Sequence, residues 1–201
     1  MLSNKSKKSK DNNPYLNYSE EVFMDMDFEP NLTTPIVPEK AKEALKKSVL
    51  DTAKKLHVAG NIDLMRDDEV IAVTIHTDRL FYPNDTILTD DADAILRPLL
   101  TPIEDPMMFK VVIAVHTDDT GSELYREYLS ISRLNSVYDW FMNQIEKGHL
   151  NENLIIIPFS MASLMPLQPN DSRKKRSENR RLEIYYVPGP KLIDLANKGL
   201  L

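Results

Sequence analysis

The spacing of apolar residues changes along the chain, and each spacing predicts a different element of secondary structure. Over residues 39–57, apolar residues recur at steps of three or four between lysines and glutamates, which predicts a helix with one narrow apolar stripe. Residues 62–64 and 70–77 alternate between apolar and polar instead, and the two aspartates at 67–68 favour a turn between them. This part of the chain is therefore predicted to form a helix followed by a β-hairpin.

Two helices and a buried strand are predicted next. Thr89 is placed to cap a helix, and Pro98 is expected to kink it. Residues 109–117 are almost continuously apolar, as in a strand that is covered on both faces. In the helical stretch 122–145 the regular apolar series starts just after Ser130. We therefore place the N-cap of the long helix at Ser130, with a shorter turn before it.

Strands are also predicted at residues 154–159 and 182–187, which completes the order β-α-β-α-β-β. Strands interleaved with helices of this length predict an α/β fold, here an α+β sandwich in which helices cover a mixed four-stranded sheet. The N-terminal helix and the first hairpin strand are additions to this core. The predicted divisions are a disordered tail or linker at 1–37, a connecting helix at 38–57, one domain at 58–190 and a short C-terminal helix at 191–201.

Composition narrows the class of protein. The 201 residues include no cysteine, which excludes a disulfide framework and thiolate chemistry. The net charge of -6 argues against nucleic acid as the main partner. The longest apolar runs, 111–115 and 154–159, are far shorter than the roughly 20 residues that a membrane-spanning helix needs. No signal peptide is recognisable, because the basic start is followed by a polar stretch, and without a lipobox cysteine any anchoring to a lipid would need another route.

The candidate chemistry lies where the strand at 109–117 ends. Asp118 follows this strand, and Arg133 is predicted to be the third residue of the helix that Ser130 caps. An arginine in the first turn opposes the helix dipole at a cost of a few tenths to about 1 kcal/mol, unless an anion binds there. A guanidinium beside free N–H groups suits a carboxylate, and Asp118 suits an ammonium group. A ligand that carries an ammonium group and a carboxylate on one carbon would engage both Asp118 and Arg133. The alternative interpretation is that the two residues form a structural salt bridge or are simply solvated charges.

Several short motifs occur at separate places along the chain. In order, they are LFYPN at 80–84, HTDDTGS at 116–122, the single residues Tyr125, Leu129, Ser130 and Arg133, and NRRLEI at 179–184. This set resembles the peptidoglycan-binding domain shared by OmpA, Pal and MotB proteins, and the resemblance covers roughly residues 60–188. It implies a mixed four-stranded sheet with helices, and a groove that binds the diaminopimelate of uncrosslinked peptidoglycan stem peptides.

The resemblance also implies roles for particular residues. It assigns Asp118 to the ammonium group of diaminopimelate and Arg133 to its carboxylate. Arg126 stands where the family usually has asparagine, and it offers a second contact to an anionic ligand; Leu134 replaces the usual alanine on the buried face of the helix. The other residues that match the family's pocket or its closing motif are Phe81, Asn84, Thr117, Leu129 and Arg180.

The expected function is that of a non-catalytic module that tethers an outer-membrane or envelope component to the cell wall. The expected partner is the diaminopimelate of a peptidoglycan stem peptide, with an envelope protein as a further candidate partner of the N-terminal region. No cofactor, metal, nucleic acid or direct membrane span is expected. The resemblance implies a periplasmic or outer-membrane-associated location.

Two other functions compete with this one. A small metal-dependent hydrolase would use His116, Asp118 and Asp119 at the strand end, although no further metal-binding or nucleophile motif accompanies them. Nucleic-acid binding would use the arginines and lysines of residues 173–181, but no aromatic residues interleave with them, so a solvated loop and strand start is expected. The tripeptide His-Thr-Asp occurs at 76–78 and again at 116–118, and we treat this as coincidence.

Overall fold

The structure, a computed structural model, describes residues 37–201, in which five strands form one mixed sheet. The strands are β1 (Asn61–Met65), β2 (Val70–His76), β3 (Phe109–His116), β4 (Ile156–Ala162) and β5 (Arg181–Pro188). Their spatial order is β1-β2-β5-β3-β4, so the last strand lies between the second and the third. β5 is antiparallel to both of its neighbours, whereas β3 and β4 are parallel. The predicted four-stranded sheet is present, and the first hairpin strand extends it at one edge.

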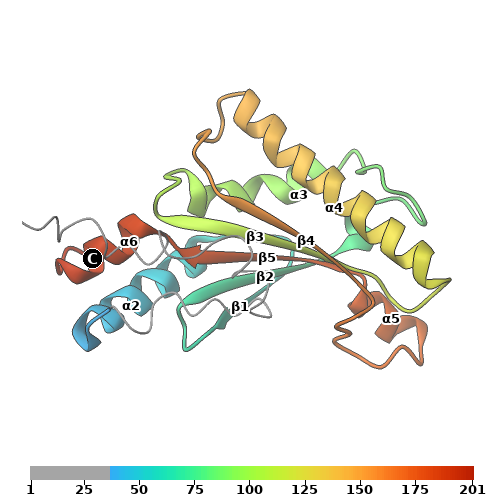
Figure 1. Cartoon of the computed structure of the whole chain (residues 1–201), viewed down its shortest axis with the longest axis horizontal. Coiled ribbons are helices and arrows are strands. Elements are labelled where there is room, and N and C mark those ends of the chain that lie inside the picture. Colours follow the sequence, from blue (N-terminus) through green and yellow to red (C-terminus); the bar gives the residue numbers. More distant parts are fainter. Residues whose placement is uncertain (1–36) are drawn as a thin grey trace, which may run out of the picture.

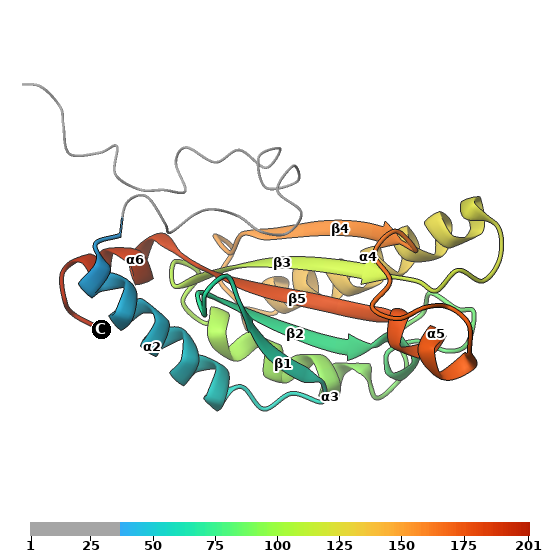
Figure 2. The same ribbon diagram turned by 90° about the horizontal axis from the view of Figure 1, so that it is seen from below.

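Two α-helices and one 3-10 helix cover one face of the sheet, and the remaining helices lie at its ends. The elements are α2 (Glu39–Lys55), α3 (Ala92–Leu96), α4 (Glu123–Glu146), α5 (Arg173–Asn179), α6 (Pro190–Asn197) and two 3-10 helices, η2 (Thr77–Arg79) and η3 (Arg97–Ile103). Figure 1 shows α3 and α4 along the same face. α2 and α6 lie side by side at one end of the sheet, and α5 lies at the other (Figure 2). No helix within residues 37–201 combines the length and the apolar character needed to cross a bilayer.

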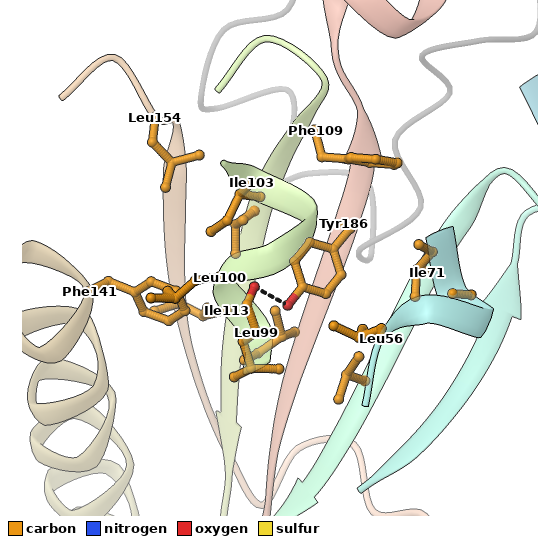
Figure 3. Packing of buried hydrophobic residues seen from close by; sticks show 14 of the residues in the cluster. Leu56, Ile71, Leu99, Leu100, Ile103, Phe109, Ile113, Phe141, Leu154 and Tyr186 are labelled. Carbon is orange, nitrogen blue, oxygen red and sulfur yellow. Dashed lines mark hydrogen bonds between the residues drawn. The ribbon is translucent and has the colours of Figure 1, made fainter. Parts of the chain in front are cut away.

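The main core lies between the sheet and the helices. Every residue of β3 and β5 is buried, and alternate side chains point to opposite faces of the sheet. On the helix-covered face, Tyr186 donates a hydrogen bond to the Leu99 carbonyl at 2.8 Å, and the Phe109 ring meets the tyrosine ring edge-on (Figure 3). The predicted stripe of α2 joins this core through Leu45 and Val49. The opposite face carries a separate buried cluster of Val70, Ala72, Val112, Ala114, Ile157, Tyr185 and Val187.

The helix predicted after Thr89 differs from the expectation at its start. The Thr89 hydroxyl donates to the Arg79 carbonyl at 3.4 Å, and the threonine contacts the helix only through its own carbonyl, which accepts from the Ala92 N–H. The side-chain cap at Thr89 is therefore wrong, and α3 begins at Ala92. Close to Pro98, where a kink is predicted, the α-helix ends at Leu96 and the chain continues as the 3-10 helix η3.

Two elements after β4 also bear on the sequence interpretation. Residues 173–179 form the helix α5, whose N-cap Ser172 accepts a hydrogen bond from the Lys175 N–H at 3.2 Å. The solvated loop expected for these residues is therefore wrong. The segment has no apolar stripe, so its sequence carries no signal by which a helix can be recognised. The C-terminal helix is confirmed as α6, and its buried residues Leu192 and Ile193 belong to the main core. The predicted tail at 1–37 lies outside the described residues apart from Val37.

Candidate functional site

One cavity of about 370 Å³ lies at the end of the sheet where β2 and β3 stop and β5 begins. Its volume falls within the roughly 300–1,000 Å³ that is usual for small-molecule sites. The structure brings all eight residues predicted for the site to the wall of this cavity: Phe81, Asn84, Thr117, Asp118, Arg126, Leu129, Arg133 and Arg180. The wall also contains six residues that the sequence analysis did not select: Asp78, Pro83, Thr120, Tyr125, Arg173 and Arg176.

Strand pairing explains why residues distant in sequence meet at this cavity. β2 and β3 both run antiparallel to β5, and His76 and His116 both stand in register with Arg181. The residues that follow β2 and β3 therefore emerge at the same edge of the sheet, one on each side of Arg180. Asp78 and Asp118 occupy equivalent positions two residues beyond these histidines. Both His-Thr-Asp tripeptides therefore place an aspartate beside the same arginine, Arg180.

Arg180 joins the two aspartates. Its Nε and Nη2 donate to Asp78 at 2.8 and 2.6 Å in a bidentate pair, and its Nη1 donates to Asp118 Oδ2 at 2.6 Å. The hydrogen bond to Asp78 is the largest influence on the Arg180 pKa, which it raises together with the bond to Asp118, against the effect of burial. Arg180 therefore fixes the edge of the cavity and is itself neutralised by two carboxylates.

Asp118 is 7% exposed and stays ionised at neutral pH. Its burial alone would raise the pKa of the carboxyl group, but the Thr120 backbone N–H and the Arg180 guanidinium together bring the pKa below its usual value. The Thr120 N–H donates to Asp118 Oδ1 at 2.9 Å. A carboxylate has about four acceptor positions on its two oxygens. The protein uses some but not all of these, through the Thr120 N–H, the Thr120 side chain and the Arg180 guanidinium, which leaves Asp118 able to accept a hydrogen bond from a cationic ligand.

Arg133 is 3% exposed, yet no carboxylate within residues 37–201 bonds to it. Its Nε donates to the Asp85 carbonyl at 2.9 Å, its Nη1 lies 3.4 Å from Thr77 Oγ1, and its guanidinium carbon is 4.9 Å from the centre of the Phe81 ring. Burial lowers its pKa, and the more distant charges of Asp78 and Asp118 oppose that effect. A buried cation without a bonded anion is costly. The cavity therefore favours an anionic group beside Arg133.

The position of Arg133 within its helix differs from the prediction. α4 is continuous from Glu123, and its N-cap is Ser122, whose Oγ accepts from the Tyr125 N–H at 3.2 Å. Arg133 thus lies about three turns from the start, where the helix dipole and the free N–H groups have no effect. The N-cap at Ser130 is wrong. That buried serine instead bridges two strands, because its Oγ donates to the Val115 carbonyl at 2.8 Å and accepts from the Ala162 N–H at 3.1 Å.

The cluster proposed for a metal-dependent hydrolase does not assemble. His116 is buried outside the cavity wall, and its Nε2 lies 2.8 Å from Glu183 Oε2. Burial lowers the pKa of this histidine, and the hydrogen bond to Glu183 offsets only part of that effect. Asp119 is exposed. Over the described range, no three histidine, aspartate or glutamate side chains gather in a way that could hold a metal ion.

Comparison with known proteins identifies the fold. No family model matches the chain, and no curated protein matches it either. Among solved structures, a MotB-like protein from Desulfovibrio vulgaris is 22% identical with a TM-score of 0.62, and the match covers 73% of this chain and 98% of that one. The periplasmic domain of Helicobacter pylori MotB is 20% identical with a TM-score of 0.51, and its match covers 68% of this chain and 83% of the other. The chain thus has the fold of these domains, and the resemblance inferred from its motifs is confirmed for the fold.

Proposed function

We propose that this chain is a non-catalytic module that binds peptidoglycan by holding the diaminopimelate of a stem peptide. The observation that carries the proposal is that one cavity is lined by both the ionised Asp118 and the buried Arg133, which bonds to no carboxylate among residues 37–201. The similarity to periplasmic domains of MotB and the family motifs support the same function.

The geometry suits an amino-acid end group. The ammonium of diaminopimelate would donate to the unused acceptor positions of Asp118, and its carboxylate would receive the remaining N–H groups of Arg133. Thr117 Oγ1 is buried on the cavity wall without a hydrogen-bond partner among the described residues, so it is available to the same ligand. Phe81 and Leu129 offer apolar contact to the carbon chain of the ligand. No step of this binding needs a metal, a nucleophile or a proton transfer.

A binding assay with purified cell-wall sacculi tests the proposal. Asp118→Ala and Arg133→Ala each remove one partner of a desolvated charge pair, a change that typically costs about 2–5 kcal/mol of binding free energy. We expect both variants to lose retention on sacculi almost completely. Arg97→Ala is the control, because Arg97 is half exposed and pairs with Asp93 on α3, away from the cavity wall. Retention of both cavity variants at the wild-type level, with unchanged thermal unfolding, would defeat the proposal.

The proposed role determines where the chain acts and what it connects. Peptidoglycan is reached from the periplasm, so we propose a periplasmic or outer-membrane-associated location. We also propose that the module tethers an envelope component, which its N-terminal region contacts. Co-purification of an envelope protein with the full chain, and its loss when residues 1–36 are exchanged for an unrelated sequence that leaves the core helix α2 in place, would support this part of the proposal.

A further inference from the structure

The charge of the cavity is opposite to that of the chain. The chain has a net charge of -6, but its cavity is lined by five arginines and only two aspartates. Arg180 is neutralised by both aspartates, and Arg133 is assigned above to the carboxylate of diaminopimelate. Three arginines therefore remain for which the proposed ligand group offers no partner: Arg126, Arg173 and Arg176.

Two of these three guanidinium groups are held in place without being neutralised. Arg126 Nη1 donates to the carbonyls of Asp119 and Gly121 at 3.2 and 2.7 Å, and its Nε is buried with no partner in the structure of residues 37–201. Arg176 Nη1 donates to the Asn170 carbonyl at 2.9 Å. Backbone carbonyls orient a guanidinium but leave its positive charge in place. Like charges gathered around one cavity repel each other, and an anionic ligand reverses the sign of that interaction.

The loop that anchors Arg176 is itself rigidly bonded. The buried Asn179 donates from Nδ2 to the Gln168 carbonyl at 2.7 Å and to Asn170 Oδ1 at 2.8 Å, and its Oδ1 accepts from the Gln168 N–H at 2.9 Å. Arg173 lies one turn before Arg176 on α5, is exposed, and makes no ion pair in the described part of the chain. Arginines from α4 and α5 thus line the same cavity as Asp118 and Arg133.

We propose that Arg126, Arg173 and Arg176 form a second anion subsite of this cavity, which binds the free α-carboxylate of the glutamate residue that precedes diaminopimelate in the stem peptide. The inference rests on the proposed function and adds a preference to it. The protein should discriminate against peptides in which that α-carboxylate is amidated. Amidation removes the negative charge but keeps the size of the group, so the discrimination depends on the arginines and not on shape.

Calorimetric titration of the full chain with two synthetic tripeptides tests this subsite. Both contain alanine, γ-linked glutamate and diaminopimelate, and they differ only in whether the glutamate α-carboxylate is free or amidated. A charged hydrogen bond contributes about 1.5–3 kcal/mol, so the wild-type protein should bind the free acid at least about tenfold more tightly. The affinity for the free acid should also fall more steeply with added salt. In Arg126→Gln, and in Arg173→Gln combined with Arg176→Gln, the preference should shrink toward about twofold or less.

Lys174→Gln is the matched control, because Lys174 is an exposed cation of α5 that does not line the cavity, and its removal changes the net charge of the chain by the same amount as one arginine variant. This variant should keep the full preference. Equal binding of both tripeptides by the wild-type protein, or a preference that survives in the arginine variants, would overturn the subsite while leaving the proposed function intact. If neither tripeptide binds, the proposed function fails and the subsite fails with it.

Discussion

The buried charge network beside the cavity gives the sharpest prediction about stability. Glu183 of β5 accepts three hydrogen bonds: from Arg181 Nε at 2.7 Å, from the Tyr185 hydroxyl at 2.7 Å, and from His116 Nε2 at 2.8 Å. Burial alone would raise its pKa, but the hydrogen bond and charge of His116, together with Arg181, lower the pKa from 4.5 to about 2. The network fixes the strand ends from which Asp118 and Arg180 extend.

The expected cost of breaking this network follows from the pKa. A decrease from 4.5 to about 2 corresponds to about 3 kcal/mol of stability, because each pH unit is equivalent to about 1.36 kcal/mol. Glu183→Gln removes the charge and leaves Arg181 buried without its anion, which costs a similar amount, about 3–5 kcal/mol. At roughly 2–4 °C per kcal/mol for a chain of this size, the variant should unfold about 6–20 °C below the wild type at neutral pH.

Thermal unfolding followed by circular dichroism measures this difference, with the exposed Glu152→Gln as the control. The pH dependence provides a second check. Because the folded-state pKa of Glu183 is depressed, its stabilisation is fully present above pH 4.5 and is lost as the pH falls toward about 2. The gap between wild type and variant should therefore close in acid. A variant that unfolds within 1 °C of the wild type at neutral pH, or a gap that is constant with pH, would refute the reasoning.

Three further outcomes are expected. The affinity for a diaminopimelate tripeptide should persist as the pH is lowered through 3.8, the ordinary pKa of an aspartate, because the pKa of Asp118 lies below that value. A loss of affinity centred above pH 3.8 in titration calorimetry would contradict the lowered pKa of Asp118. Ser130→Ala should lower the free energy of unfolding by about 1–3 kcal/mol, because it leaves a carbonyl of β3 and an N–H near the end of β4 without their partner; denaturant unfolding with no change would show the bridge to be unimportant. Gly189→Ala should destabilise the junction of β5 and α6, because a Cβ there would lie 2.2 Å from the Met107 carbonyl oxygen; an unchanged unfolding midpoint would show that the chain can move apart.

The sheet could be predicted from the sequence, but the details of its helices could not. Strands leave a signal of period two or a continuous apolar run, and both signals depend on burial, which is high in β3 and β5. The start of α4 gives no such signal because Leu124 and Tyr128 are exposed. The regular apolar series therefore starts only after Ser130, and the N-cap predicted from it is wrong. α5 gives no such signal either, since its residues are polar or charged and only Asn179 is buried.

The candidate site was predicted from motifs, and its geometry comes from strand pairing. Sequence resemblance selected Asp118, Arg133 and Arg180, and the structure brings all three to one cavity. The resemblance in sequence could not show that Arg180 bonds to Asp78. That contact spans about a hundred residues and depends on β5 lying between β2 and β3. The repeated His-Thr-Asp was the available clue. This repeat becomes informative only when the strand order is known, because the two histidines end β2 and β3, and both of these strands pair with β5.

The central claim is that Arg133 binds the carboxylate at the amino-acid end of diaminopimelate, and a double-mutant cycle between protein and ligand measures it most directly. Wild type and Arg133→Gln would each be titrated with a tripeptide whose diaminopimelate end carboxylate is free or amidated. We expect either change alone to weaken binding strongly and the second change to add little, with a coupling of about 1.5 kcal/mol or more. Additive losses, with a coupling close to zero, would contradict it.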